Sequence, residues 1–573
     1  MYAPLDAYAY QDGLGRTIQV VSSGDTSQQW VLSGQVTRDA RGRVTAAFVP
    51  TFIAASSGGS VAISPPTGAS TGMTYDAFSR VLTTTDIDGT PTATNAYHAG
   101  SLDMYDAETV STGGKHAGAF VTMTQDGHGR TVSALKRGNG GSVTTTTTYQ
   151  ATGEVTSMSR IGTDTYGPVT YQRWMQYDTL GRLIVNAEPN ASSDPLLRST
   201  NSAYWLYAYD DLGDLVGTSD PRACGENIAY DGAGRLQSEN YSPCDSVNQA
   251  PYTPPSTAAG DGDGTEAFYV YEGPSLQTGQ LSDVYDRASH SHLTHDARGR
   301  LIEVDRQIAN PGTPTSALSS RYSPTIWTAT MGYDDRDRIT TQSTGADVSQ
   351  LESSNAKYTG HFGPSAVGVT YSTRGNLQTA TGSYGPLVTG LAIEADGRPD
   401  SMTYADAAQT TLSYAYKDSR RRLTQVLISR AKPFPSATST YTPPPANAAQ
   451  PTQQTVLAND VTVIYDQVNN PILTEDERID AEWPTGAKPV TSHTYAYDDS
   501  YRVTSVTNTY NAGTDPYTPP LASNMPDTSP LPMSVTPASR VLSQTFTYDG
   551  LGNLMASTDD ANIFPERSLG KPS

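Results

Sequence analysis

The chain has 573 residues, of which 36% are hydrophobic, and its formal net charge at pH 7 is -21. Because this acidity is not interrupted by any long run of Lys or Arg, the composition argues against nucleic acid and anionic membranes as partners. No apolar run approaches the length of a transmembrane helix, which argues against membrane insertion.

The first predicted element is a β-hairpin tip at residues 11–16, where Asp12 is followed three residues later by Gly15 and then by Arg16. This spacing is typical of a type I turn in which the Asp side chain bonds the turn backbone. The Gly then takes the left-handed conformation that completes a bulged loop. The clearest copy lies at residues 177–183, Tyr-Asp-Thr-Leu-Gly-Arg-Leu, whose flanking Tyr and Leu suit half-buried strands.

Versions of this template recur along the whole chain. Close copies lie at 209–215, 230–236 and 548–554. Copies that keep Asp, Gly and Arg without the Tyr lie at 11–16, 38–43, 125–130 and 295–300. Copies that replace the Gly, or are altered further, lie at 75–80, 333–338, 465–470, 497–502, 417–423, 149–154 and 371–376, with a variant turn at 395–399. About fifteen related sites indicate one repeat array rather than several compact domains.

Between the tips, Thr, Val and Tyr alternate with polar residues, as in the Thr-rich run 142–149, which favours strands over helix or disorder. Residues 46–53 form an unusually apolar patch that we expect to face inward. Four stretches rich in Gly, Ser, Pro or Ala are predicted to be loop excursions near 56–71, 248–266, 431–454 and 511–537. The sequence therefore predicts an all-β fold, a single continuous antiparallel array over residues 1–573.

The repeated tip resembles that of the YD-repeat, or Rhs-repeat, family over nearly the whole length of the chain. Local details are more similar still to the B and C components of bacterial insecticidal toxin complexes; these details lie at residues 12–19, 33–39, 483–489 and 548–570. The resemblance implies a long β-sheet that spirals into a hollow shell and, in toxin systems, encloses a toxic C-terminal cargo. It also implies toxin-complex components as partners and a secreted or cell-surface location, although residues 1–10 lack the features of a signal peptide.

Relatives in these toxin complexes continue beyond the equivalent of residues 567–570 into a self-cleaving protease region and a variable toxin. Neither region is found in this sequence, and no end cap is visible before Asp12, so we expect a fragment truncated at both ends relative to the family. No cleavage or toxin residue can be carried over.

Several patterns in the sequence resemble chemical sites. Residues 68–72 match the G-x-S-x-G pattern of serine hydrolases, which requires a strand before Ser70 and a helix after it. Pro65 and Pro66 precede this pattern and a strand-like run follows it, which argues against catalysis. Paired carboxylates are abundant, but the repeat Asp residues already have a structural role at the tips. We expect no catalytic residue and no enzyme activity.

Two places in the sequence carry residue types that bind metal ions. The only His cluster contains His290, His292 and His295 beside Asp286 and Asp296, and two imidazoles with a carboxylate could bind zinc. His295, however, occupies the Tyr position of a repeat. A partial calcium loop formed by Asp261, Gly262, Asp263, Gly264 and Glu266 lacks further ligands. We expect no metal and no cofactor.

Two further expectations concern bonds between segments. Cys224 and Cys244 flank the 230–236 tip, where antiparallel strands could join them in a disulfide. The recurrent Asp and Arg or Asn are expected to bond across neighbouring tips and so form a ladder down the array.

These observations predict a non-catalytic shell segment that encloses a toxic or unfolded polypeptide in a toxin-delivery system. The alternative is an extracellular adhesion or glycan-binding array whose exposed Tyr faces bind carbohydrate. The orientation of the Tyr residues is expected to distinguish the two functions.

Overall fold

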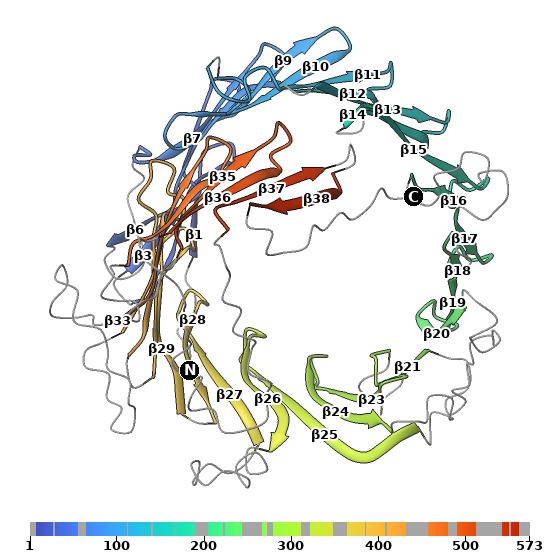
Figure 1. The fold of residues 1–573 in the computed structure, drawn as a ribbon. Coiled ribbons are helices and arrows are strands. Elements are labelled where there is room, and N and C mark those ends of the chain that lie inside the picture. Colours follow the sequence, from blue (N-terminus) through green and yellow to red (C-terminus); the bar gives the residue numbers. More distant parts are fainter. Residues whose placement is uncertain are drawn as a thin grey trace.

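The computed structural model describes residues 7–26, 29–54, 65–111, 113–138, 141–164, 167–189, 204–221, 224–242, 266–271, 279–310, 321–347, 364–383, 385–406, 409–430, 456–478, 490–510, 541–548 and 552–560. Within these residues the fold is all-β, as predicted, with one long antiparallel sheet and one small sheet (Figure 1). None of the described segments forms a helix with the length and apolarity needed to cross a bilayer. The excursions predicted at 248–265, 431–454 and 511–537, and residues 56–64 of the first, lie outside the described residues.

The small sheet contains four strands in the order β1-β2-β3-β6, namely β1 (Ala7–Gln11), β2 (Thr17–Ser23), β3 (Gln29–Ser33) and β6 (Thr51–Ala54). Val21, Trp30 and Val31 are buried here. The apolar patch at 46–53 is divided between β5 (Val44–Phe48), which belongs to the long sheet, and β6.

The long sheet joins consecutive strands in an antiparallel ladder. Its first part contains β4 (Val36–Arg38), β5, β7 (Ser70–Tyr75), β8 (Val81–Thr85), β9 (Pro91–His98), β10 (Ser101–Asp106), β11 (Val121–Gln125), β12 (Thr131–Gly138), β13 (Gly141–Tyr149), β14 (Val155–Asp164), β15 (Gly167–Tyr177), β16 (Leu183–Ala187), β17 (Trp205–Tyr209), β18 (Leu215–Ser219), β19 (Gly225–Tyr230) and β20 (Leu236–Ser242).

The same ladder continues through the rest of the chain. Its second part contains β21 (Ala267–Val270), β22 (Asp283–Asp286), β23 (Ser289–His295), β24 (Leu301–Ala309), β25 (Tyr322–Tyr333), β26 (Ile339–Asp347), β27 (Pro364–Tyr371), β28 (Leu377–Gly382), β29 (Gly385–Ile393), β30 (Pro399–Tyr404), β31 (Thr411–Ala415), β32 (Gln425–Arg430), β33 (Val456–Tyr465), β34 (Pro471–Asp476), β35 (Val490–Tyr497), β36 (Val503–Tyr510), β37 (Ser543–Tyr548) and β38 (Leu554–Asp559).

The predicted hairpin tips from 38–43 onward connect strands of this ladder, whereas the tip at 11–16 connects β1 and β2 of the small sheet. In the 177–183 tip, Gln176 pairs with Val185 and Tyr177 pairs with Leu183, so the register shifts by one residue at a bulge beside the turn. The Asp178 N–H bonds the Arg182 carbonyl at 2.9 Å, and the Gly181 N–H bonds the Asp178 carbonyl at 3.1 Å. This is the bulged loop that the sequence predicts.

The left-handed residue of each tip is retained where Gly has been replaced. Gly181 has a φ of 79°. Non-glycine residues take the same region at this position in five altered copies: Ser79, Asp337, Arg421, Asn469 and Tyr501. The turn geometry is thus conserved within the array even where L-amino acids adopt it at a steric cost.

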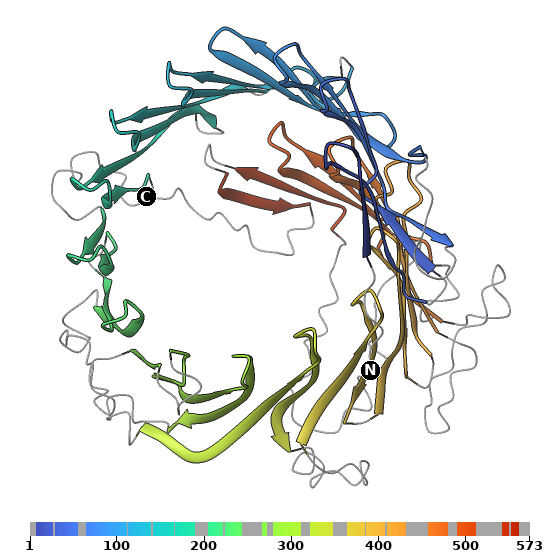
Figure 2. The ribbon, with the colours of Figure 1, turned by 180° about the vertical axis from the view of Figure 1, so that it is seen from behind.

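The long sheet curves through a full circle, so that its late strands lie beside its early ones (Figures 1 and 2). The early strands β7 and β9 and the late strands β35 and β36 run along one side of the ring in both views. The sheet is not closed, and its last strands, β37 and β38, turn toward the centre (Figure 1). The result is a spiral ribbon one sheet thick, which explains why so few apolar side chains are needed for its core.

Candidate functional site

Each hairpin tip is held by its Asp side chain. In the tip at 178–182, Asp178 Oδ1 accepts bonds from the N–H groups of Leu180 and Arg182, both at 2.9 Å. Its Oδ2 accepts a bond from Arg182 Nε at 2.7 Å. These bonds, led by the one from the Arg182 backbone, hold the pKa of the Asp178 carboxyl below its usual range. The same set recurs at Asp12, Asp39, Asp76, Asp126, Asp231, Asp296, Asp334 and Asp498.

The Arg at the fifth position of a tip reaches the next tip along the edge. Arg300 Nη1 donates to the Asp334 carbonyl at 3.0 Å, and its guanidinium lies 4.8 Å from the centre of the Tyr333 ring. We call this contact the inner rung. Equivalent backbone bonds link Arg43, Arg130, Arg182 and Arg422 to the tips that follow them.

The repeat Tyr completes the link in the opposite direction. Tyr333 donates its hydroxyl hydrogen to the Leu301 carbonyl of the preceding tip at 2.7 Å. Eight further Tyr hydroxyls make the equivalent bond at 2.6–3.0 Å: those of Tyr75, Tyr149, Tyr230, Tyr371, Tyr416, Tyr465, Tyr497 and Tyr548. The predicted ladder is confirmed for Arg, whereas the Asp side chains at the first position of the described tips bond within their own tips. Asp396 of the variant turn is different, because it pairs with Arg421 of the next tip at 3.3 Å.

A second set of inter-tip bonds was missed from the sequence. Arg at the third position of a tip donates to the carbonyl at the second position of the next tip, and we call this contact the outer rung. The donors and acceptors are Arg41 with Ala77, Arg298 with Asp335, Arg336 with Thr373, Arg374 with Ala395, and Arg420 with Gln467. The only available signal was Arg recurring at a position that the template leaves open.

The hairpin tips define one edge of the long sheet, the tip edge, and the connections on the opposite side define the return edge. Where the ribbon passes its own beginning, late tips lie against early return connections, and we call this line of contact the seam. Arg420 Nε lies 3.1 Å from Asp88 Oδ2, and the Gln467 N–H donates to Glu108 at 2.9 Å. Arg374 pairs with Asp25 at 3.0 Å.

The seam continues at the tip that contains Asp498. His116 Nδ1 lies 2.8 Å from Asp499 Oδ1, and the imidazole is buried. Tyr501 donates its hydroxyl hydrogen to Asp106 at 2.8 Å, and Lys115 Nζ donates to the Tyr497 carbonyl at 3.0 Å. Each of these seam contacts involves a side chain, in contrast to the backbone ladder within the sheet.

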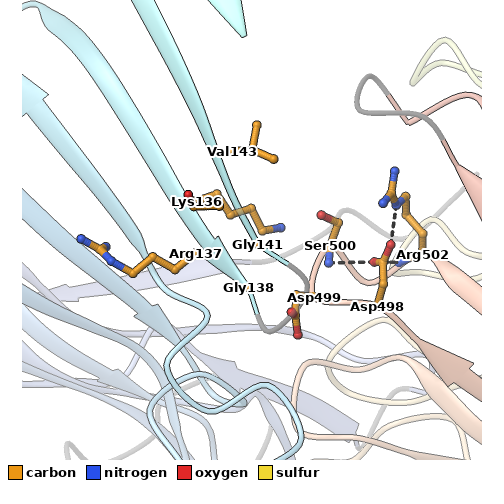
Figure 3. Close-up of a pocket in the computed structure, with 10 residues that line it drawn as sticks. Lys136, Arg137, Gly138, Gly141, Val143, Asp498, Asp499, Ser500 and Arg502 are labelled. Carbon is orange, nitrogen blue, oxygen red and sulfur yellow. Dashed lines mark hydrogen bonds and ion pairs between the residues drawn. The ribbon is translucent and has the colours of Figure 1, made fainter. Parts of the chain in front are cut away.

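A cavity of about 160 Å³ lies in the seam between the ends of β12 and β13 and the tip at 498–502. Figure 3 shows Lys136 extending toward that tip, with Asp499 beside Gly138. Burial lowers the pKa of Lys136 and raises that of Tyr501. The cavity combines both signs of charge, and its walls come from segments far apart in the sequence.

The G-x-S-x-G pattern does not form a hydrolase turn. Ser70 begins β7 and pairs with Phe48 of β5, so a strand follows it instead of the helix that the mechanism requires.

In the His cluster, His290 and His292 share a carboxylate partner that the sequence did not single out. His290 Nε2 and His292 Nδ1 both contact Asp283 Oδ1, at 3.0 and 2.9 Å, whereas Asp286 bonds the backbone of Ser289 and Asp296 pairs with Arg300. His295 pairs with Leu301 in the register of a repeat Tyr. Among the described residues, no group of three His, Cys, Asp or Glu side chains is placed to hold a metal ion.

Two other predictions fall partly outside the described residues. Asp261 to Gly264 of the candidate calcium loop lie outside them, and Glu266 is buried and paired with Arg287. Cys224 is disulfide-bonded, in agreement with the expected disulfide, although Cys244 lies outside the described part of the chain.

One carboxyl pair was not anticipated. Glu226 on β19 and Glu239 on β20 interact, and burial, reinforced by the Glu239 charge, raises the pKa of Glu226. Tyr269 Oη lies 3.4 Å from Glu239. Two Glu residues on separate strands carry no sequence signal for this pairing.

Comparison with solved structures finds the same fold in toxin-complex proteins. A crystal structure of TcdB2-TccC3 without its hypervariable C-terminal region matches with a TM-score of 0.69 at 15% identity, covering 97% of this chain and 26% of that chain. A TcdB2-TccC3-Cdc42 structure matches with a TM-score of 0.67 at 14% identity. The Photorhabdus luminescens Tc holotoxin pore matches with a TM-score of 0.63 at 14% identity.

This chain has a toxin-complex shell fold. It spans about a quarter of the length of those matching chains, since 25–26% of each is covered. No protein-family model and no curated protein matches the sequence. The predicted resemblance to the toxin-complex components is confirmed at the level of fold.

Proposed function

We propose that this chain is a non-catalytic wall segment of a toxin-complex shell that encloses a toxic or unfolded polypeptide, in a secreted or cell-surface setting. The seam carries this proposal, because it joins one winding of the ribbon to the next after the backbone ladder has joined strand to strand. The backbone ladder extends the wall along the ribbon, and the seam extends it from one winding to the next. The fold shared with toxin-complex chains supports the same role.

The chemistry of the tips also supports a wall. The Asp, Arg and Tyr groups that recur most often bond one another or the backbone, which leaves them as structural links rather than reactive groups. The net charge of -21 favours retention of a basic cargo by electrostatic attraction. Glycan binding receives less support, because the repeat Tyr rings that would stack on sugars carry Arg guanidinium groups on one face.

Protease protection tests this function. An unstructured, protease-sensitive segment would be added after Ser573 and its cleavage compared with that of the same segment free in solution. We expect slower cleavage in the fusion and intermediate cleavage when Asp88→Lys and Asp499→Lys together disrupt the seam. Cleavage of the wild-type fusion as fast as the free segment would rule out enclosure by this chain.

A further inference from the structure

The fourth residue of a tip, which takes the left-handed conformation, also links neighbouring tips where it is not Gly. In three altered copies its side chain accepts a bond from the Arg at the fifth position of the preceding tip: Arg43 with Ser79 at 3.2 Å, Arg300 with Asp337 at 2.7 Å, and Arg422 with Asn469 at 3.2 Å. In a fourth copy, Arg421 pairs with Glu394 of the preceding tip at 3.2 Å. Each of these residues strengthens the ladder along the ribbon.

Tyr501 is the exception, because its side chain contacts the other winding. Its hydroxyl donates to Asp106 at 2.8 Å, while its backbone keeps a φ of 60°. A left-handed backbone is costly for a bulky residue, and such strain persists where the surrounding structure maintains it for a function. Tyr501 therefore adopts this conformation for a contact across the seam and not for the ladder.

Three side-chain contacts hold the 498–502 tip against the first winding, and we call them the latch. They are Tyr501 with Asp106 at 2.8 Å, Asp499 with His116 at 2.8 Å, and Lys115 with the Tyr497 carbonyl at 3.0 Å. The rings of His116 and Tyr501 also pack edge to face, with their centres 5.3 Å apart. Because none of these contacts is a strand pairing, the latch can release while the strands on both sides stay intact.

Beyond the latch, strands β35–β38 form a unit with strong internal links. Between its two hairpins, the Arg502 guanidinium lies 4.7 Å from the centre of the Tyr548 ring, and Tyr548 donates its hydroxyl hydrogen to the Val503 carbonyl at 2.8 Å. The ladder joins the same hairpins through β36 and β37. The two hairpins are therefore expected to move together.

The junction of this unit with β34 is weaker. The tip before the junction ends with Asn470, which bonds Asp466 of its own tip at 2.8 Å, so this position sends no guanidinium to the next tip. Of the usual pair of links, the bond from the Tyr497 hydroxyl to the Pro471 carbonyl remains, at 2.6 Å. The ladder here is short, since β34 pairs with β35 through residues 473–475. A junction with few links is where a hinge forms.

We propose that β35–β38 is a hinged flap, which bends at the β34–β35 junction and is held against the first winding by the latch. Its last strands, β37 and β38, turn toward the centre of the ring (Figures 1 and 2). Release of the latch therefore moves strands that lie toward the centre. On the proposed shell function, on which this consequence rests, the flap controls passage between the space within the ring and the outside.

Double electron–electron resonance between spin labels on Thr124→Cys of β11 and Thr509→Cys of β36 tests the flap in the full chain. Both Thr side chains are exposed, and Cys224 is disulfide-bonded and takes no label. We expect one narrow distance distribution while the latch is intact. Asp499→Ala together with Tyr501→Gly removes two latch contacts, and we expect this latch variant to show a longer mean distance and a broader distribution.

The latch variant keeps a tip that can fold, because Gly is the residue that most tips carry at the left-handed position and the template leaves the second position open. Circular dichroism checks that its strand content is unchanged. Ser500→Ala, in the same tip but outside the latch, is the matched control and is expected to give the wild-type distribution. A folded latch variant with the wild-type distribution, or a Ser500→Ala variant that opens equally, would overturn the proposal.

The hinge is tested by restoring the missing link. Asn470→Arg places the template residue before the junction, and we expect it to narrow the distance distribution of the latch variant again. A latch variant that stays equally broad with Asn470→Arg would show that the unit does not bend at this junction. The measurement uses no cargo, so its failure would leave the protease-protection test of enclosure unaffected.

Discussion

At the scale of single residues, the tip Asp is the group on which the local structure depends most. Asp231 accepts bonds from the Ala233 N–H, the Arg235 N–H and Arg235 Nε at 2.7–3.0 Å. These bonds satisfy turn N–H groups that the strand ladder cannot reach, and they orient the Arg that forms the inner rung.

Removal of this carboxylate tests its role. Asp231→Ala leaves two turn N–H groups without their acceptor and releases Arg235, so we expect a lower urea midpoint of unfolding than in the wild type. Equilibrium unfolding followed by circular dichroism measures this change. Asp211→Ala, at the second position of a tip, is the control and should unfold like the wild type, and equal midpoints for the two variants would contradict the role of Asp231.

The tip carboxylates also predict a pH dependence. The side-chain bond from Arg16 lowers the pKa of Asp12 to about 2, and the bond from Arg300 lowers that of Asp296 to about 2. Because an unfolded Asp titrates near pH ~3.9, these groups favour the folded state above about pH 4, and that contribution is lost as the pH falls toward about 2. We expect the urea midpoint to fall across this window. Asp296→Asn should reduce the slope, and an unchanged midpoint between pH 4 and 2 would refute the linkage.

At the scale of the element, the hairpin and its neighbour are joined by the repeat Tyr. Tyr333→Phe removes the bond to the Leu301 carbonyl while keeping the ring beneath Arg300, so we expect a loss of about 1 kcal/mol in the free energy of unfolding. Equilibrium urea unfolding measures it. Tyr207→Phe, on β17 and outside the tip pattern, is the comparison. An equal loss of unfolding free energy in both variants would show that the hydroxyl bond of Tyr333 does not stabilise the tip.

The strands and tips were predictable because their signals are local. Asp178 and Gly181 fix one turn, and Thr and Tyr at alternate positions fix the strands beside it. The five non-glycine residues at left-handed positions were recognised as altered copies because Asp remained before them and Arg, or Asn470 in one copy, followed them. The turn at Gly397 begins at Glu394, because the Glu394 N–H bonds the Arg398 carbonyl, so Glu394 and not Asp396 occupies the Asp position of the template.

The seam was beyond sequence analysis for a physical reason. His116 and Asp499 are 383 residues apart, and their contact depends on curvature summed over many strand pairs. No local pattern encodes that sum. The contact of both His290 and His292 with Asp283 was also not predictable, because it depends on the cross-strand register between β22 and β23.

At the scale of the whole molecule, the contacts of the seam hold the ribbon in its circular path. A Cβ added to Gly138 would lie 2.7 Å from Asp499 Oδ2 and 3.1 Å from Asp499 Cβ, so the two windings approach too closely for a larger residue.

This close approach gives a prediction about overall shape. Gly138→Val is expected to push the tip at Asp499 away and increase the radius of gyration measured by small-angle X-ray scattering, while the strand content measured by circular dichroism stays the same. Gly127→Val is the control, because a Cβ at Gly127 meets nothing within 4 Å. An unchanged scattering profile for Gly138→Val would show that the seam does not maintain the shape.

The difference between backbone bonds along the ribbon and side-chain contacts across its seam gives the molecule the mechanics of a coil spring. Such a body resists stretching along its strip but yields between loops, so a small axial force separates the loops before any hairpin ruptures. We therefore expect the coil to lengthen and recoil without unfolding.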